Sequence, residues 1–128
     1  MKKIFISFLC VIMVMVFMPT MVFAAEEPMS EEDFRDALQT GEVDLKGATV
    51  TLNDVISLAD SREYTVKNGT IAMSESYENT DPNNKVIAVQ GNGTILNLEN
   101  VTVIAASANR GAIYVGNGGK LTATDLTV

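Results

Sequence analysis

The chain has no histidine, no tryptophan and a single cysteine, Cys10, among its 128 residues. These absences exclude a zinc site built from cysteine and histidine, a Ser-His-Asp triad and a disulfide within the chain. Nine basic residues against 16 acidic ones give a net charge of −7, which is the wrong sign for a nucleic-acid surface. What remains is an acidic chain with no expected nucleic-acid partner, long enough for one domain.

The first 24 residues follow the order of features of a secretory signal peptide. Two lysines precede an uncharged apolar run, 4–18, which Pro19 ends. Val22 and Ala24 then occupy the −3 and −1 positions of a signal-peptidase site. We therefore expect cleavage after Ala24, with 25–29 as an acidic linker.

An uncleaved membrane anchor is the alternative, because the apolar stretch approaches the ~20 residues that a spanning helix needs. Pro19 and the small residues before the acidic linker favour cleavage. Cys10 lies inside the apolar run, directly after Phe8 and Leu9, so it does not fit a lipid-attachment site. We expect a secreted or cell-surface protein that has no membrane segment after signal cleavage.

Residues 30–41 carry the pattern of a short amphipathic helix. Ser30 is a favourable N-cap, and the three acidic residues that follow it suit a helix N-terminus. Phe34 and Leu38 share one face, and Gly41 is a natural stop.

Three segments beyond this helix align with one another, and apolar residues alternate with polar ones in each. This period of two is typical of strands with one buried face. In the second repeat it predicts strands near 86–89, 94–98 and 101–103. The three repeats are 55–71, 86–103 and 112–128.

Six apolar columns run through the alignment. They are Ile56, Ile87 and Ile113; Leu58, Val89 and Val115; Tyr64, Leu96 and Leu121; Val66, Leu98 and Ala123; Ile71, Val103 and Val128; and Gly69, Val101 and Leu126, where the first member is a glycine. A further column holds Asn68, Asn100 and Asp125, between the second and third strands. Because Asn and Asp tolerate left-handed backbone, we expect a sharp bend there and a structural ladder of these side chains.

This pattern resembles the right-handed parallel β-helix of pectin-lyase-like proteins. The resemblance implies an all-β solenoid of about three coils over 42–128, with 43–54 as an incomplete leading turn and 30–41 as a helix that caps the N-terminal end. Asn68 and Asn100 match the stacked asparagines of that family. Asp125 departs from the pattern, since an ionised carboxylate only accepts hydrogen bonds and ends an amide ladder. The alternative fold is an antiparallel β-sandwich with chance self-similarity.

The strand pattern of 120–128 runs to Val128 without a polar cap. A bare last coil would leave backbone hydrogen-bonding groups unpaired. We therefore expect further coils beyond this chain, or self-association, to cover that end.

Two classes of function follow from the resemblance. The leading hypothesis is a non-catalytic extracellular or cell-surface module, similar to a stalk or an adhesin, that binds a polysaccharide or a host or cell-surface glycan. The alternative is the N-terminal part of a pectate-lyase-like polysaccharide lyase or glycoside hydrolase. No catalytic constellation is readable, and we expect no cofactor; Ca²⁺ enters only under the lyase alternative. Glu75, Glu78 and Asp81 supply oxygen ligands, but their spacing does not match a Ca²⁺ loop.

Two tyrosines are candidate glycan contacts. Tyr114 holds an outward position of the third repeat, and Tyr77 lies in the long spacer after the first. Ordinary packing between strands is the competing interpretation of both rings. Thr70, Thr102 and Thr127 form an outward column that strand propensity alone explains.

Overall fold

A computed structural model describes residues 27–77, 85–106 and 111–128. The predicted signal peptide, 1–24, lies outside the described residues, as do Glu78 and Asp81. The elements are α2 (Glu31–Gln39), β1 (Glu42–Asp44), β2 (Thr49–Leu52), β3 (Ile56–Leu58), β4 (Glu63–Met73), β5 (Lys85–Gln90), β6 (Ile95–Ile104), β7 (Gly111–Gly116) and β8 (Lys120–Thr127).

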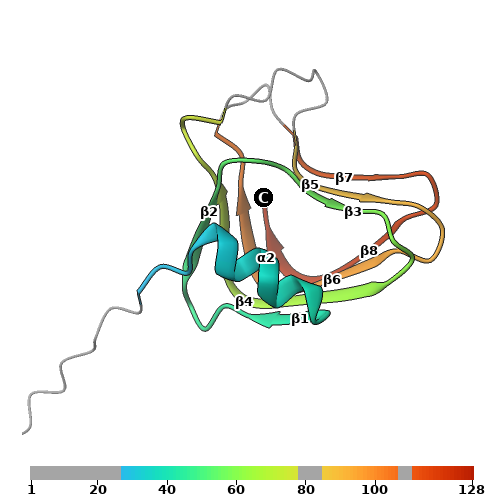
Figure 1. The fold of residues 1–128 in the computed structure, drawn as a ribbon, viewed down its shortest axis with the longest axis horizontal. Helices are drawn as coiled ribbons and strands as arrows, with labels where there is room; N and C mark the ends of the chain where they lie inside the picture. The colour runs from blue at the N-terminus through green and yellow to red at the C-terminus, as the bar shows by residue number, and fades with distance from the viewer. Residues whose placement is uncertain (1–26, 78–84, 107–110) are drawn as a thin grey trace, which may run out of the picture.

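The strands form two parallel sheets. The larger sheet has the order β1-β4-β6-β8, with β2 also paired to β4, and the smaller has the order β3-β5-β7. Successive repeats lie side by side in both sheets, because β4, β6 and β8 are neighbours, as are β3, β5 and β7 (Figure 1). The fold is all-β with one short helix, and its parallel pairing is incompatible with an antiparallel sandwich.

The strand register reproduces the columns of the sequence alignment. Tyr64 pairs with Leu96, and Leu96 pairs with Leu121. In the smaller sheet, Ile87 lies between Ile56 and Ile113 in the same way. A one-residue slip would turn each apolar side chain to the opposite face, so the buried columns fix this register.

The predicted bend is present, but it does not separate two strands. Asn68, Asn100 and Asp125 have φ angles of 55°, 53° and 52°, in the left-handed region. The strands β4, β6 and β8 continue through these residues. The reason is that pairing resumes in the same register directly after each bend.

The leading segment extends this stacking toward the N-terminus. Both β1 and β2 pair in parallel with β4, on the two sides of its bend. Between them, the buried side chain of Leu45 lies where a side chain at Gly69 would go. A Cβ at Gly69 would also lie 2.7 Å from the carbonyl oxygen of Ala48. The glycine in the sixth column therefore makes room for Leu45.

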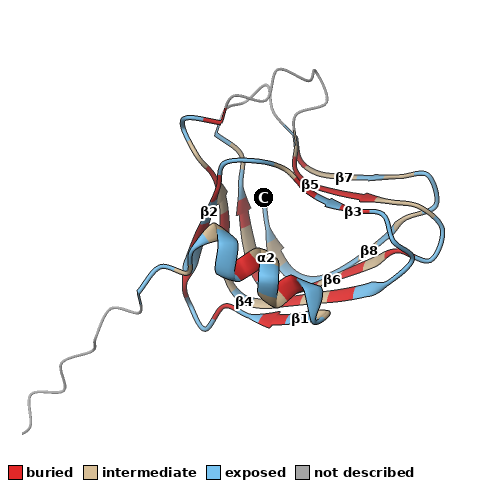
Figure 2. Ribbon diagram, viewed as in Figure 1, coloured by how far each residue is buried: buried red, intermediate tan, exposed pale blue. Residues whose placement is uncertain are grey.

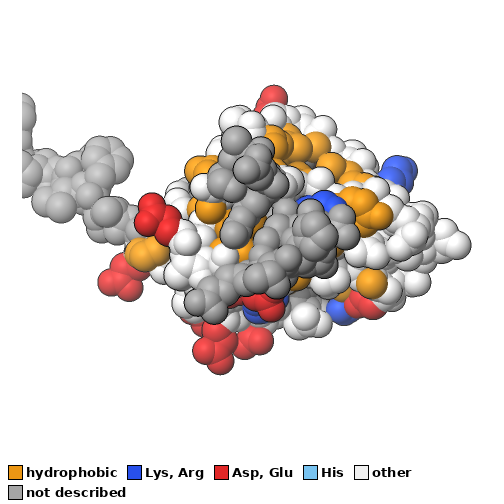
Figure 3. All heavy atoms as spheres, turned by 90° about the horizontal axis from the view of Figure 1, so that it is seen from above, with side chains coloured by type: hydrophobic (Ala, Val, Ile, Leu, Met, Phe, Trp, Pro, Cys, Tyr) orange, Lys and Arg blue, Asp and Glu red, His pale blue; other side chains and the backbone are white. Residues whose placement is uncertain are grey.

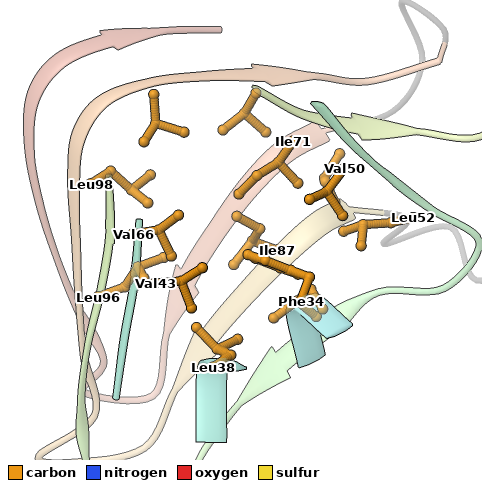
Figure 4. Packing of buried hydrophobic residues seen from close by; sticks show 14 of the residues in the cluster. Phe34, Leu38, Val43, Val50, Leu52, Val66, Ile71, Ile87, Leu96 and Leu98 are labelled. Atoms are coloured by element: carbon orange, nitrogen blue, oxygen red, sulfur yellow. The ribbon is translucent and has the colours of Figure 1, made fainter. Parts of the chain in front are cut away.

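The helix α2 lies across the end formed by β1 and β2 (Figure 1). As predicted, Ser30 is its N-cap, and the Ser30 hydroxyl accepts a hydrogen bond from the Asp33 backbone N–H at 3.1 Å. Phe34 and Leu38 are buried and lie beside Val43 and the other core residues in Figure 4.

Two arginine clamps hold the helix to the strands. Arg35 bonds Glu31 at 2.6 Å and donates to the carbonyl oxygens of Asp54 and Val55. Glu31 in turn accepts from the backbone and side chain of Asn53. These bonds tie the helix to the turn between β2 and β3.

The second clamp joins the other end of the helix to the turn before β4. The Arg62 guanidinium donates to the backbone and side-chain oxygens of Gln39 and pairs with Asp60 at 2.6 Å. The Tyr64 hydroxyl also donates to Asp60, at 2.6 Å. Burial, followed by this bond, raises the pKa of Tyr64 above its ordinary value. Both ends of α2 are thus fixed by side chains of the strand region.

Burial decreases from the helix end toward β8. Val43 of β1, Tyr64 and Val66 of β4, and Leu96 and Leu98 of β6 are all buried. No residue of β8 is fully buried (Figure 2). Val115 of β7 is 40% exposed.

Candidate functional site

A shallow groove of about 330 Å³ runs along the outside of the bend in β4 and β6. Its lining consists only of uncharged residues: Gly47, Asn68, Gly69, Thr70, Asn100 and Thr102. The bend places each asparagine two residues before a threonine, so the stacked strands repeat the same amide and hydroxyl pair. The groove therefore crosses the strands and presents one donor–acceptor set per repeat.

The side-chain ladder at this bend has a direction. Asn100 Nδ2 donates to Asn68 Oδ1 at 3.3 Å, and Asn68 Nδ2 donates to Asp44 Oδ1 at 3.1 Å. Each amide thus donates toward the helix end of the molecule. No hydrogen bond joins the side chains of Asp125 and Asn100 within the described residues, and an ionised Asp125 has no donor to offer Asn100.

Asp44 is a member of the ladder that the repeat alignment missed. Its carboxylate also accepts the Lys46 backbone N–H at 3.0 Å. This backbone bond, followed by the Asn68 amide, holds the pKa of Asp44 below its ordinary range. The ladder therefore starts from a charged acceptor that is well satisfied near neutral pH.

Several polar groups of the groove are left available. Asn100 uses its amide N–H toward Asn68, so its Oδ1 keeps its acceptor capacity. The hydroxyls of Thr70 and Thr102 make no hydrogen bond to another side chain among residues 27–77, 85–106 and 111–128. Such neutral donors and acceptors are the groups that sugar hydroxyls bind.

The threonine column is longer than the sequence predicts. Thr49 pairs with Thr70, Thr70 with Thr102, and Thr102 with Thr127. Thr49 and Thr127 lie outside the groove lining. The column thus contains two threonines that line the groove, Thr70 and Thr102, and two equivalent threonines outside it.

Tyr114 lies in the smaller sheet, away from the bend. It pairs with Ala88, and Lys85 Nζ lies 4.0 Å from its ring centroid. Its hydroxyl end lies against Gly116. An ammonium already occupies part of the ring surface, so Tyr114 makes an internal cation–π contact while staying partly exposed. In the view from above, hydrophobic and polar side chains are mixed on this face (Figure 3).

The structure contradicts Tyr77 as a glycan contact. The residue is 3% exposed and belongs to the hydrophobic core. Its hydroxyl donates to the Lys85 carbonyl oxygen at 3.3 Å. The Tyr77 ring therefore fills the interior instead of facing solvent.

The described residues contain no cluster of three or more His, Cys, Asp or Glu side chains that could hold a metal ion. Of the three acidic spacer residues, only Glu75 is described. No described helix is long and apolar enough to cross a membrane.

The comparisons with known proteins return no match: no family profile, curated protein or solved structure is significantly similar to this chain. The geometry of the groove and ladder is thus the basis for any functional assignment.

Proposed function

We propose that the chain is a right-handed parallel β-helix of about three coils, capped at one end by α2. Three observations support this architecture. Repeats pair in parallel in both sheets, bends recur at left-handed residues, and the apolar columns lie in register. Solenoids of this kind bury a core by stacking neighbours, and they present regular outer faces.

We also propose that this coil is a non-catalytic module of a secreted or cell-surface protein and that it binds glycan chains in the bend groove. The observation that carries this proposal is the set of available polar groups in the groove, namely the Asn100 side-chain oxygen and the hydroxyls of Thr70 and Thr102. The groove is open and uncharged, so it suits a neutral stretch of polysaccharide better than an ionic ligand. Tyr114 lies on another sheet and is a separate, weaker candidate for sugar stacking.

The test is binding of neutral and acidic oligosaccharides by the purified chain, followed by NMR or calorimetry. The double substitution Thr70→Val and Thr102→Val removes both hydroxyls while keeping β-branched side chains, and it should weaken binding about tenfold, as expected for two lost hydrogen bonds.

The matched control is Thr49→Val with Thr127→Val, which removes two hydroxyls from the same column outside the groove. It should leave the affinity unchanged. Equal losses in both double variants, or no binding to any oligosaccharide, would contradict the groove as the site. Release of new reducing ends or unsaturated products from the same oligosaccharides would favour the enzyme alternative.

Secretion has its own test. In a host that exports the protein, N-terminal sequencing of the released chain should begin at Ala25. A chain retained in the membrane with Met1 intact would overturn the signal-peptide assignment.

A further inference from the structure

The outer edge of β7 and β8 is the least covered part of the core. Leu121, Leu126 and Ile113 are only partly buried, and Val128 is 76% exposed. These residues continue the apolar columns that are closed in the two preceding repeats. No described strand pairs with this edge of either sheet. The edge is thus continuous with the stacking interface that builds the rest of the molecule.

The backbone of this edge has alternate free groups. The Lys120 N–H donates to the Thr94 carbonyl oxygen at 3.0 Å, toward β6. Because successive residues of a strand point to opposite sides in the hydrogen-bonding plane, the N–H groups of Leu121 and Ala123 face outward. They are available to a further parallel strand.

Asp125 adds a chemical requirement at the bend. The ladder donates toward the helix end, so whatever lies beyond Asp125 must supply the donor. An ionised carboxylate accepts hydrogen bonds only, and an asparagine amide in the next position would continue the ladder in its existing direction.

We propose that this edge is a docking site for a further coil, supplied as a peptide of two short strands that meet at an asparagine. The partner pairs in parallel with β8, covers Leu121, Ala123 and Leu126, and places its bend asparagine on Asp125. The proposal is independent of glycan binding, because the groove lining contains no residue of β8.

A second copy of this chain fits the edge less well. Its helix end is covered by α2, so head-to-tail stacking is blocked. Face-to-face stacking would set the strands antiparallel, and each copy would offer the other a ladder that ends in a carboxylate without a donor.

The chain itself provides a probe. A peptide of residues 94–104 contains the bend residue Asn100, and in the β6 register this asparagine falls on Asp125. Labelled peptide with added terminal lysines for solubility is titrated onto the purified chain by fluorescence anisotropy. Hydrogen exchange should show new protection at Leu121 and Ala123.

A cycle of substitutions isolates the bend contact. The peptide with Asn100→Asp should bind about tenfold more weakly, since two carboxylates then face each other. The Asp125→Asn chain should reduce the difference between the two peptides, because it removes the repulsion between the two carboxylates. Ala123→Pro in the chain removes an outward N–H but no bond to β6, and it should weaken both peptides.

Several outcomes overturn the proposal. They are no saturable binding, equal affinity of both peptides for the unaltered chain, and unchanged affinity after Ala123→Pro. Concentration-dependent dimerisation that excludes the peptide in ultracentrifugation would assign the edge to a second copy instead. If Asp125→Asn fails to fold by thermal melting, the two peptides on the unaltered chain still decide the question.

Discussion

The two ends of the stacked sheets differ in what covers the same apolar columns. At the β1 and β2 end, Phe34 and Leu38 of α2 are 1% and 4% exposed. At the β7 and β8 end, Val115 is 40% exposed, although its column partner Val89 is fully buried. Both residues are valines, but β5 has a paired strand on each side, whereas β7 has one on a single side. Burial at a column position is therefore set by the adjacent repeat more than by the side chain itself.

The largest expected effect comes from opening the covered end. Phe34→Ala removes a fully buried ring and should lower the free energy of unfolding by about 3–5 kcal/mol. Leu126→Ala removes a partly buried side chain at the open edge and should cost only about 1 kcal/mol. Urea denaturation of both variants at pH 7 measures the difference. Equal losses would mean that the open edge is covered in solution.

A smaller effect is expected from the ladder. Asn68→Ala removes bonds to Asp44 and Asn100 and places alanine in the left-handed region, which together should cost about 2 kcal/mol. Asp125→Ala imposes the same backbone conformation without breaking a ladder bond, and it should cost about 1 kcal/mol.

The difference between these two variants in urea denaturation measures the ladder bonds. Asn68→Gly is the control for backbone strain, since glycine accepts a positive φ freely. It should be less destabilised than Asn68→Ala. Identical stability of the Ala variants at positions 68 and 125 would mean that the ladder bonds contribute nothing.

The smallest effect is a pH dependence at the covered end. Burial raises the pKa of Glu31, but hydrogen bonds from Asn53 and Arg35 outweigh it, so the net pKa lies below the ordinary 4.5. A lowered folded-state pKa stabilises the fold above pH 4.5, and this contribution is lost as the pH falls through the folded-state value. Melting temperature of the unaltered chain should therefore begin to drop below pH 4.5.

Glu31→Gln should remove the part of the acid-induced drop in melting temperature that protonation of Glu31 causes. The part due to Asp44 and Asp60 should remain below pH 3.8, because hydrogen bonds lower the pKa of both carboxyls. If the melting temperature of Glu31→Gln falls at acidic pH as much as that of the unaltered chain, protonation of Glu31 does not weaken the attachment of the helix.

Repetition made most of the sheet architecture predictable. Columns such as Tyr64, Leu96 and Leu121 reflect one environment that recurs in each repeat, so the sequence alignment predicts the strand register. The bend residues were found for the same reason, because a left-handed position selects Asn or Asp in each repeat.

What lies outside the repeats was harder to predict. Asp44 joins the ladder from the leading segment, where no second copy of the pattern identifies it. The arginine clamps bind backbone carbonyls, which carry no sequence signal. Tyr77 was misassigned because a tyrosine in a polar spacer has the same sequence context whether the spacer turns outward or inward. The groove is formed jointly by residues of β4 and β6, so the sequence pattern of one strand alone does not predict it.

Each of β4, β6 and β8 pairs with a strand that precedes it in the chain, so we expect the larger sheet to assemble in chain order. During synthesis the N-terminal side emerges first, so α2, β1 and β2 are available before β4 arrives. Each later strand then pairs with an earlier strand of its own sheet, β5 with β3, β6 with β4, β7 with β5 and β8 with β6. The helix thus covers the first edge of the stack, and the sheets extend from it in one direction, toward β7 and β8.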